Sequence, residues 1–359
     1  MIAPRRRTNL SLLLALVVPV AALACRQVLG IESDAPLAGD VEGGTPDDSS
    51  TPDVGTGAKD GGHADADGGA SDAALCGDVC PIEILAGDLG QSTYLAVDGQ
   101  NVYFADEGAA IGSVSQCPKA GCKGKPVLLG EGYATGIAFD ATRVYWNDPS
   151  GDKVMACTIG GCANAPTSIA GTQVSAKALA GDGTSLAWAS NGSIRTCAAG
   201  NCASPKTLAQ NQTGFSGLSV DSSIVYWTND TADGGVFSCA AAGCTTPTRI
   251  GTGTGVVTAK NGLTFWVAGN GIVSCSSPTC PTPKTIGAST RPVGLVTDGT
   301  YVYWRDVLEQ KVLRCHRDGC TGAAEVLAKN QPGAPGTNLA IDGEYVYWTN
   351  QAQVLRRHK

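Results

Sequence analysis

A short aromatic motif that recurs seven times constrains the fold of this chain more than any other feature. Its last residue returns at intervals of 38 to 44 residues, and all six Trp of the protein stand at that position. The seven copies lie at residues 102–104, 144–146, 186–188, 225–227, 264–266, 302–304 and 346–348. Repetition with a period near 40 residues indicates a series of similar supersecondary units that stack on one another.

Each unit contains further fixed points. An Asp stands six residues before the aromatic marker in all copies except the fifth, where Lys260 replaces it. A Cys-x4-Cys pair follows the motif in six copies, and a short continuous apolar run, typical of a strand covered on both faces, precedes the Asp. The six aspartates are Asp98, Asp140, Asp182, Asp221, Asp298 and Asp342. Four short strands joined by turns, repeated in series, are typical of a β-propeller. We therefore predict an all-β, seven-bladed β-propeller of four-stranded blades.

The two ends of the repeat region complement each other. The last unit ends before its fourth strand, whereas residues 76–86 read like an isolated fourth strand. We expect this N-terminal strand, at residues 82–86, to complete the last blade, because such closure removes two exposed sheet edges. Six or eight blades are the alternatives to seven.

The motif resembles that of the YWTD propellers of low-density-lipoprotein-receptor type. The similarity lies in Val-Tyr-Trp-Thr-Asn at 225–229 and 346–350, in Val-Tyr-Trp-Asn-Asp at 144–148, and in the apolar-Asp-Gly turn before the motif. Two departures stand out: that family usually has six blades, and its motif lacks the Cys pair. The resemblance implies binding and scaffolding roles and no particular ligand.

The paired cysteines have two chemical interpretations, zinc ligands or disulfides. Zinc needs four ligands, and pairs on different blades of a ring are too far apart to share one ion. Each pair flanks a turn, where facing strands bring the Cα atoms within disulfide reach. We therefore predict seven disulfides, which join Cys76 to Cys80, Cys117 to Cys122, Cys157 to Cys162, Cys197 to Cys202, Cys239 to Cys244, Cys275 to Cys280 and Cys315 to Cys320.

The N-terminus has the features of an export signal. Arg5, Arg6 and Arg7 precede an apolar run that is too short to span a bilayer, and the run ends in Ala22-Leu23-Ala24-Cys25. This segment resembles a bacterial lipoprotein box, which implies cleavage after Ala24 and lipidation of Cys25. Ordinary secretory cleavage that leaves Cys25 as a free thiol is the alternative. Residues 1–24 are thus the predicted signal peptide, and the mature protein is expected in the cell envelope, lipid-anchored in the outer membrane.

Residues 31–75 hold eleven acids and one Lys, with no aromatic side chain. Such a segment cannot bury enough apolar surface to offset its ordering entropy. We predict an acidic, disordered linker over 25–75 and the propeller over 76–359. The propeller itself is nearly neutral, so the basic stripe that nucleic-acid binding requires is missing and no nucleic-acid partner is expected.

The sequence constrains the function of the chain less than it constrains the fold. Polar residues two positions beyond the aromatic markers are candidates for a ligand site, but Asp and Asn at strand ends usually bind backbone N–H groups instead. They are Asp106, Asp148, Ser190, Asn229, Asp306 and Asn350, with Ala268 in the fifth copy. The Tyr and Trp of the motif are interpreted as packing between blades rather than as a sugar platform.

No catalytic residue, metal ligand or cofactor site is assigned. We expect a monomeric binding or scaffold module for an unidentified protein, peptide or glycan, with the membrane as a second partner through Cys25. The alternative is a propeller enzyme, lyase-like or lactonase-like, with its site in the central channel. Apolar and small side chains at the channel would favour binding, and converging polar groups would favour catalysis.

Overall fold

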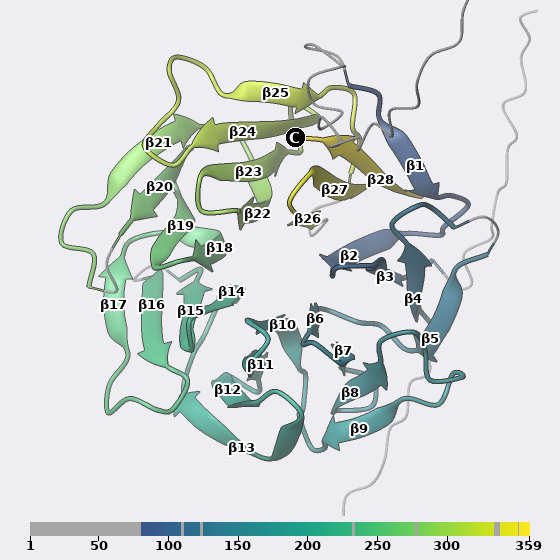
Figure 1. Cartoon of the computed structure of the whole chain (residues 1–359). Helices are drawn as coiled ribbons and strands as arrows, with labels where there is room; N and C mark the ends of the chain where they lie inside the picture. The colour runs from purple at the N-terminus through teal and green to yellow at the C-terminus, as the bar shows by residue number, and fades with distance from the viewer. Residues whose placement is uncertain are drawn as a thin grey trace, which may run out of the picture. The chain divides into compact units, whose positions relative to one another are not determined.

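The computed structural model describes residues 80–108, 111–122, 125–231, 234–276, 279–333, 338–350 and 352–359. They form strands β1 to β28, which make seven four-stranded antiparallel sheets arranged as the blades of a ring (Figure 1). The predicted seven-bladed, all-β propeller is confirmed. The predicted signal peptide, the lipidation site Cys25 and the linker lie outside the described residues.

Every blade has the same order of strands from the centre of the ring outward. The innermost strands are β2 (Ser92–Val97), β6 (Ile137–Phe139), β10 (Lys177–Gly181), β14 (Phe215–Asp221), β18 (Thr254–Lys260), β22 (Pro292–Thr297) and β26 (Leu339–Ile341). The second strands are β3 (Asn101–Asp106), β7 (Arg143–Asp148), β11 (Ser185–Ser190), β15 (Ile224–Asn229), β19 (Leu263–Ala268), β23 (Tyr301–Asp306) and β27 (Tyr345–Asn350). The third strands are β4 (Ser113–Pro118), β8 (Lys153–Thr158), β12 (Ser193–Ala198), β16 (Gly235–Ala240), β20 (Gly271–Cys275), β24 (Lys311–His316) and β28 (Gln353–His358). The outer strands are β5 (Val127–Glu131), β9 (Thr167–Ala170), β13 (Asn201–Ala209), β17 (Thr248–Gly251), β21 (Lys284–Ala288), β25 (Glu325–Ala328) and β1 (Glu83–Ala86). We number the blades 1 to 7 by their inner strands, from β2 to β26.

The N-terminal strand closes the ring, as the sequence predicted. In blade 7, β1 pairs with β28, with Glu83 opposite Arg356 and Ala86 opposite Val354. The Arg356 guanidinium lies 2.7 Å from the Glu83 carboxylate, so an ion pair crosses the junction of the two chain ends. Leu85 and Ala86 are buried there in a core cluster with Tyr347 and Val354. The seam therefore has both a hydrogen-bonded ladder and a small apolar core.

The aromatic motif packs the blades against one another. Neighbouring residues of a strand point to opposite faces, so the Tyr and the Trp of one motif enter different interfaces. Tyr145 of blade 2, for example, packs in one cluster with Trp188 of blade 3, while Trp146 packs with Tyr103 of blade 1. All six Trp are fully buried. The interpretation of these rings as packing between blades is confirmed.

In the described part of the chain, no helix is long and apolar enough to cross a membrane.

Candidate binding site at the centre of the ring

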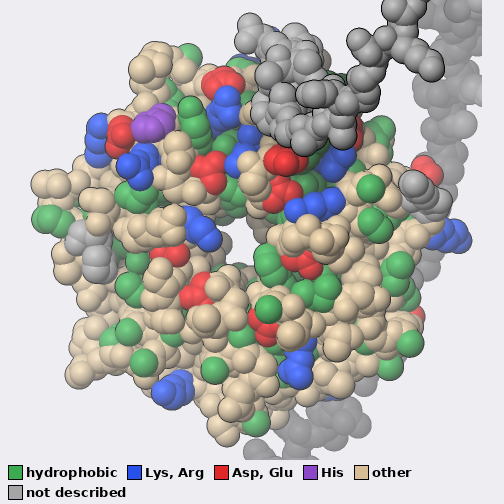
Figure 2. Space-filling model, viewed as in Figure 1, with side chains coloured by type: hydrophobic (Ala, Val, Ile, Leu, Met, Phe, Trp, Pro, Cys, Tyr) green, Lys and Arg blue, Asp and Glu red, His purple; other side chains and the backbone are tan. Residues whose placement is uncertain are grey.

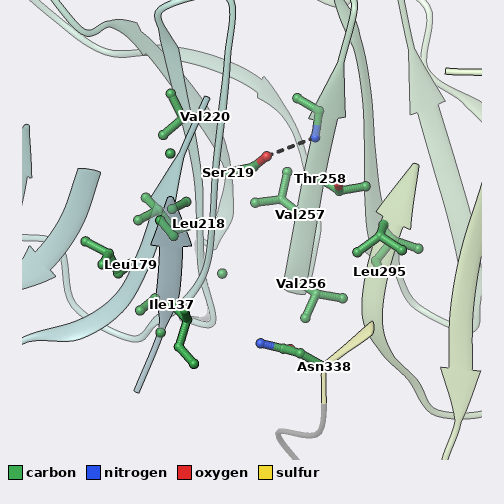
Figure 3. Close-up of a pocket in the computed structure, with 18 of the residues that line it drawn as sticks. Ile137, Leu179, Leu218, Ser219, Val220, Val256, Val257, Thr258, Leu295 and Asn338 are labelled. Atoms are coloured by element: carbon green, nitrogen blue, oxygen red, sulfur yellow. Dashed lines mark hydrogen bonds between the residues drawn. The ribbon is translucent and has the colours of Figure 1, made fainter. Parts of the chain in front are cut away.

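The inner strands of all seven blades enclose a central cavity of about 420 Å³. Figure 2 shows that the ring is open at its centre. Five successive inner strands contribute the aliphatic side chains of Ile137, Leu179, Leu218, Val257 and Leu295 to the wall (Figure 3). Polar and charged side chains also line it, among them those of Asp182, Asp221, Lys260 and Asn338. Glycine is required where inner strands approach most closely: a Cβ on Gly136 would lie 2.1 Å from the backbone nitrogen of Leu179. The inner strands are therefore closely packed, and the channel that they enclose has a mixed aliphatic and polar lining.

The hydroxyl groups along this wall make structural hydrogen bonds. Ser219 Oγ accepts the Ala259 N–H at 3.0 Å, which joins blade 4 to blade 5 (Figure 3). Thr135 Oγ1 donates to the Ala176 carbonyl at 3.1 Å, which joins blade 2 to blade 3. Ser216 Oγ donates to Asp230 Oδ1 at 2.6 Å. A nucleophilic hydroxyl needs an adjacent base that orients and deprotonates it. Thr135 has no such base among these bonds and joins two blades, whereas Ser216 has the Asp230 carboxylate beside it.

One mouth of the channel is ringed by the turns that join inner to second strands. We call it the aspartate mouth, and it comprises Asp98, Asp140, Asp182, Asp221, Lys260, Asp298 and Asp342. In Figure 2, acidic side chains surround the opening on the face in view. Five of these turns share one design, illustrated by Asp140, whose Oδ1 accepts the N–H groups of Thr142 and Arg143 at 2.7 and 2.8 Å. Its Oδ2 accepts the hydroxyl of Tyr145, the Tyr of the same blade's motif. Asp221 instead accepts the Gly262 N–H of blade 5. In the five turns that share the design, the recurrent Asp thus shapes its own turn.

Hydrogen bonds favour the charged form of the Asp140 and Asp342 carboxylates. Burial alone would raise the pKa of Asp140, but the bonds from Tyr145, Thr142 and Arg143 outweigh it and lower that pKa. For Asp342, burial is likewise outweighed, chiefly by Lys119 and the backbone of Tyr345, and the pKa falls to about 2.

Charge is distributed unevenly around the aspartate mouth. Asp342 pairs with Lys119 at 2.6 Å, and Asp298 pairs with Lys359 at 3.0 Å. In blade 5, Lys260 takes the place of the Asp. The mouth is therefore locally compensated over blades 5 to 7 and carries its negative charge over blades 1 to 4.

Four of the strand-end residues on the opposite face, Asp106, Asp148, Ser190 and Asp306, bind backbone groups as predicted, whereas Asn229 and Asn350 bind glutamine side chains. Asp106 and Asp148 accept N–H groups of their own loops, among them those of Gly108 and Gly151. Asp306 is the extreme case: it is 1% exposed and accepts six hydrogen bonds. Burial would raise its pKa, but hydrogen bonds from Glu309, Ser289, Thr290 and Arg291 hold the pKa far below the usual range.

The other strand-end positions have equally local roles. Ser190 Oγ donates to the Val174 carbonyl at 3.1 Å, and the Asn350 amide donates to Gln353 Oε1 at 3.1 Å. Asn229 Nδ2 donates to Gln212 Oε1 at 2.9 Å. These residues belong to loop scaffolding rather than to one assembled site.

Three glutamines were not singled out from the sequence, although they recur. Gln173, Gln212 and Gln331 accept the indole N–H groups of Trp188, Trp227 and Trp348 at 2.8 to 2.9 Å. A buried indole N–H without a partner is costly, so these amides stabilise the motif Trp of three blades. The signal was available, because each Gln precedes its Trp by 15 to 17 residues.

Six of the predicted Cys-x4-Cys pairs are disulfides. Their Cα atoms are 5.1 to 5.7 Å apart, and each pair closes the turn between a third and an outer strand. The bonds join Cys117 to Cys122, Cys157 to Cys162, Cys197 to Cys202, Cys239 to Cys244, Cys275 to Cys280 and Cys315 to Cys320. Repeated disulfides are typical of an oxidising, extracytoplasmic compartment.

The seventh predicted disulfide differs from these six. Cys80 has no disulfide partner among the described residues. Its expected partner, Cys76, lies outside them. The bond between Cys76 and Cys80 therefore stays a prediction.

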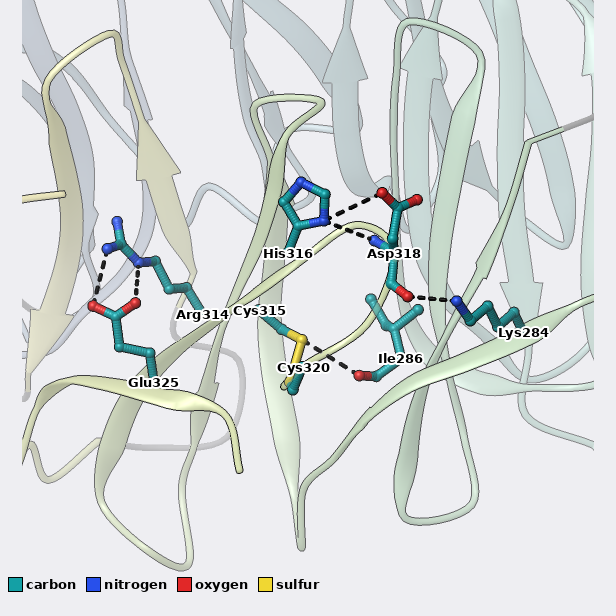
Figure 4. The surroundings of a disulfide bond; sticks show 8 residues. All are labelled: Lys284, Ile286, Arg314, Cys315, His316, Asp318, Cys320 and Glu325. Atoms are coloured by element: carbon teal, nitrogen blue, oxygen red, sulfur yellow. Dashed lines mark hydrogen bonds and ion pairs between the residues drawn. A yellow bond between two sulfur atoms is a disulfide. The ribbon is translucent and has the colours of Figure 1, made fainter. Parts of the chain in front are cut away.

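The disulfide turns also contact the preceding blade. Cys320 N–H donates to the Ile286 carbonyl on β21 at 2.9 Å, and Lys284 of the same strand donates to the Asp318 carbonyl within the turn (Figure 4). At the seam, Cys122 N–H donates to the Leu85 carbonyl on β1 at 2.9 Å. A disulfide here therefore stiffens a loop that is itself part of a blade interface.

Histidine and metal chemistry have little support at the ring centre. His316 stands at the end of β24 against Asp318, and His358 ends β28, so both lie outside the cavity lining (Figure 4). Within the described ranges, no group of three or more His, Cys, Asp or Glu side chains is arranged to hold a metal ion.

No family model matches the sequence, and no curated protein matches it. Solved structures do match the fold. U3-55K aligns with a TM-score of 0.60 and 12% identity over 77% of this chain and 98% of its own. Virginiamycin B lyase from Staphylococcus aureus aligns with a TM-score of 0.59 and 12% identity over 78% of this chain and 99% of its own. YCF48 bound to D1 peptide aligns with a TM-score of 0.58 and 11% identity over 78% of this chain and 94% of its own. Identities this low show a shared propeller fold alone, and that fold serves both binding proteins and an enzyme.

Proposed function

We propose that this chain is an exported lipoprotein, anchored through Cys25, whose propeller binds a protein, peptide or glycan. The observation that supports the binding role is that many polar groups around the channel make structural hydrogen bonds. Wall hydroxyls join blades, and most of the aspartates cap turns, so the ring offers a rigid, charged mouth on a channel of mixed aliphatic and polar lining. Rigid rings with fixed surface chemistry suit recognition, because little ordering entropy is lost on binding.

A channel enzyme is the second candidate, and the likeness to virginiamycin B lyase brings it forward. One of the matching lyase structures is described as a catalytically inactive variant in which a histidine is replaced by alanine. The described lining of this cavity includes Asp182, Asp221 and Lys260 beside aliphatic side chains, but no His. The lack of a lining His among the described residues favours binding over chemistry that depends on a histidine.

Binding is tested by capture from envelope extracts with the tagged full chain. We expect a small set of proteins, peptides or glycans that an excess of untagged chain displaces. The purified partner should then re-form the complex with a Kd of about 10 µM or tighter by calorimetry. Identical recovery with and without the competitor would contradict the binding function, as would turnover of a captured compound.

Anchoring is tested separately through the predicted lipidation site. The wild-type chain should incorporate labelled fatty acid and partition into detergent, whereas Cys25→Ser should do neither and should be released from the membrane. A single acyl chain binds membranes only marginally, so multiple acylation at Cys25 is the expected source of stable attachment. Absence of label from the wild type would refute the lipoprotein assignment while leaving export open.

A further inference from the structure

A second cavity, of about 530 Å³, lies at the aspartate mouth over blades 1 to 3. Its rim carries Asp98, Asp140 and Asp182 from three successive blades, and its apolar wall includes Phe139 and Ile159. We call it the rim pocket. It adjoins the central channel, with which it shares Phe139, Asp182 and Lys260, and it brings three recurrent aspartates to one space.

The three carboxylates are fixed in place. Asp98 Oδ1 accepts the Gln100 and Asn101 N–H groups, both at 2.7 Å. Asp182 binds its own turn through Oδ1 and the Ser223 N–H of the next blade through Oδ2, at 2.8 Å. Their orientation therefore does not depend on a ligand.

The negative charge of these carboxylates is not compensated locally. No Lys or Arg forms an ion pair with any of the three in the part of the chain that the structure describes. A carboxylate has about four acceptor positions. Asp98 accepts from Gln100, Asn101 and Tyr103, so it retains capacity for a further donor. Asp140 and Asp182 already accept four bonds each, so the pocket can attract a cation through three charges and hydrogen-bond to it through Asp98.

The apolar part of the rim pocket is equally constrained. Ile159 stands inside the turn that the disulfide between Cys157 and Cys162 closes, and its N–H donates to the Thr142 carbonyl at 2.9 Å. Phe139 ends the inner strand β6 and is half-buried. Both side chains are therefore held at the surface by a disulfide turn and a strand rather than by a flexible loop.

Lys260 is the one basic residue of the rim pocket, and it also lines the central channel. It comes from blade 5, where the other six blades have Asp, and its side chain is exposed. Its ammonium reduces the negative potential of the pocket from one side only. The chain's own acidic linker, residues 31–75, carries the wrong charge to occupy the pocket.

We propose that the rim pocket binds a cationic peptide segment in which a Lys or Arg neighbours an apolar residue. The basic side chain lies against the carboxylates of blades 1 to 3, and the apolar side chain contacts Phe139 and Ile159. This inference rests on the proposed binding function and adds to it the site and the chemical class of the partner. Charge complementarity of this kind steers encounter and fixes orientation.

The test measures binding of short fluorescent peptides to the full chain by anisotropy. The probes are a peptide of alternating Lys and Leu, a Glu and Leu peptide, and a Lys and Gly peptide. We expect only the Lys and Leu peptide to bind well, with an affinity that falls at least about tenfold when salt rises from about 20 to 500 mM, because the Debye length shortens.

Substitutions then locate the site. Lys260→Asp restores the residue of the other blades and should tighten binding about fivefold to tenfold, whereas Asp140→Asn should weaken it about threefold to fivefold. Ile159→Ser should weaken binding of the Lys and Leu peptide while leaving the Lys and Gly peptide unchanged. Asp318→Asn, in an exposed disulfide turn of blade 6, is the matched control and should have no effect.

The outcomes separate this site from the broader function. If Lys260→Asp lowers the melting temperature, Lys260→Ala repeats the test with a smaller change of charge. If the Lys and Leu peptide binds all variants with equal affinity, or if the Glu and Leu peptide binds equally well, the proposal that the rim pocket binds a cationic peptide is wrong. If a captured partner still binds every variant equally, the binding function stands and the proposed site is wrong.

Discussion

Deleting residues 76–88 should lower the melting temperature of the full chain by at least about 10 °C. The deletion removes β1, and with it the ladder to β28, the buried Leu85 and Ala86, and the ion pair from Glu83 to Arg356. It also removes the carbonyl of Leu85, which accepts the Cys122 N–H of blade 1. The loss therefore reaches two blades, and differential scanning calorimetry with limited proteolysis of the C-terminal blade measures it.

Deletion of residues 31–74 is the matched control, because it shortens the chain by more without removing any strand that the structure describes. Its melting temperature should stay within about 2 °C of the wild-type value. An unchanged melting temperature and unchanged protease resistance after removal of 76–88 would show that the seam contributes little to stability.

Replacement of Asp306 by Ala should reduce the free energy of unfolding by about 3–5 kcal/mol. The change leaves six donors without their acceptor, among them the backbone N–H groups of Thr290, Arg291, Leu308 and Glu309. Asp148→Ala is the control. It removes a carboxylate that serves only its own exposed loop and should reduce the free energy by about 1 kcal/mol. Urea denaturation of both variants compares the two effects, and equal losses would contradict the role given to Asp306.

The lowered pKa values of Asp306 and Asp342 predict how the stability of the chain changes in acid. The folded-state pKa of Asp306 lies below its unfolded value, so the stabilisation is present above about pH 4 and is lost as the pH falls further. Asp342, with a pKa lowered to about 2, behaves in the same way over the window from about pH 4 to 2. Asp306→Ala should therefore show a shallower loss of stability below pH 4 than the wild-type chain.

The fold was predictable because its determinants are local and repeated. The aromatic motif, the Asp six residues before it and the Cys pair after it each mark one strand or turn, and their spacing counts the blades. Closure was also readable, because residues 76–86 match the strand missing from the last unit. The pairing of β1 with β28 bears this out.

Much of the candidate site was not predictable, because it depends on contacts between blades. The sequence shows Asp298 and Asp342 as equivalents of Asp140, but not that Lys359 and Lys119 neutralise them. The exception at Lys260 was visible, whereas its place beside aspartates of blades 1 to 3 needed the ring. Gln173, Gln212 and Gln331 lie in the connections that lead from one blade to the next. Their hydrogen bonds to the Trp indoles form only once the chain has folded back through the inner strand of that next blade.

In most blades the Tyr of the motif packs against the next blade and the Trp against the previous one, so most blades present the same two complementary sides. Phe104, Ala187 and Phe265 are the exceptions. Most of the interfaces are consequently interchangeable, and a blade duplicated or lost in the course of evolution would meet a compatible neighbour on each flank. The side chains at the interfaces do not by themselves set the number of blades. The curvature of the ring and the seam between β1 and β28 set it. Chains built on this plan can therefore change the circumference of the ring, and with it the bore of the channel, through gain or loss of one whole unit.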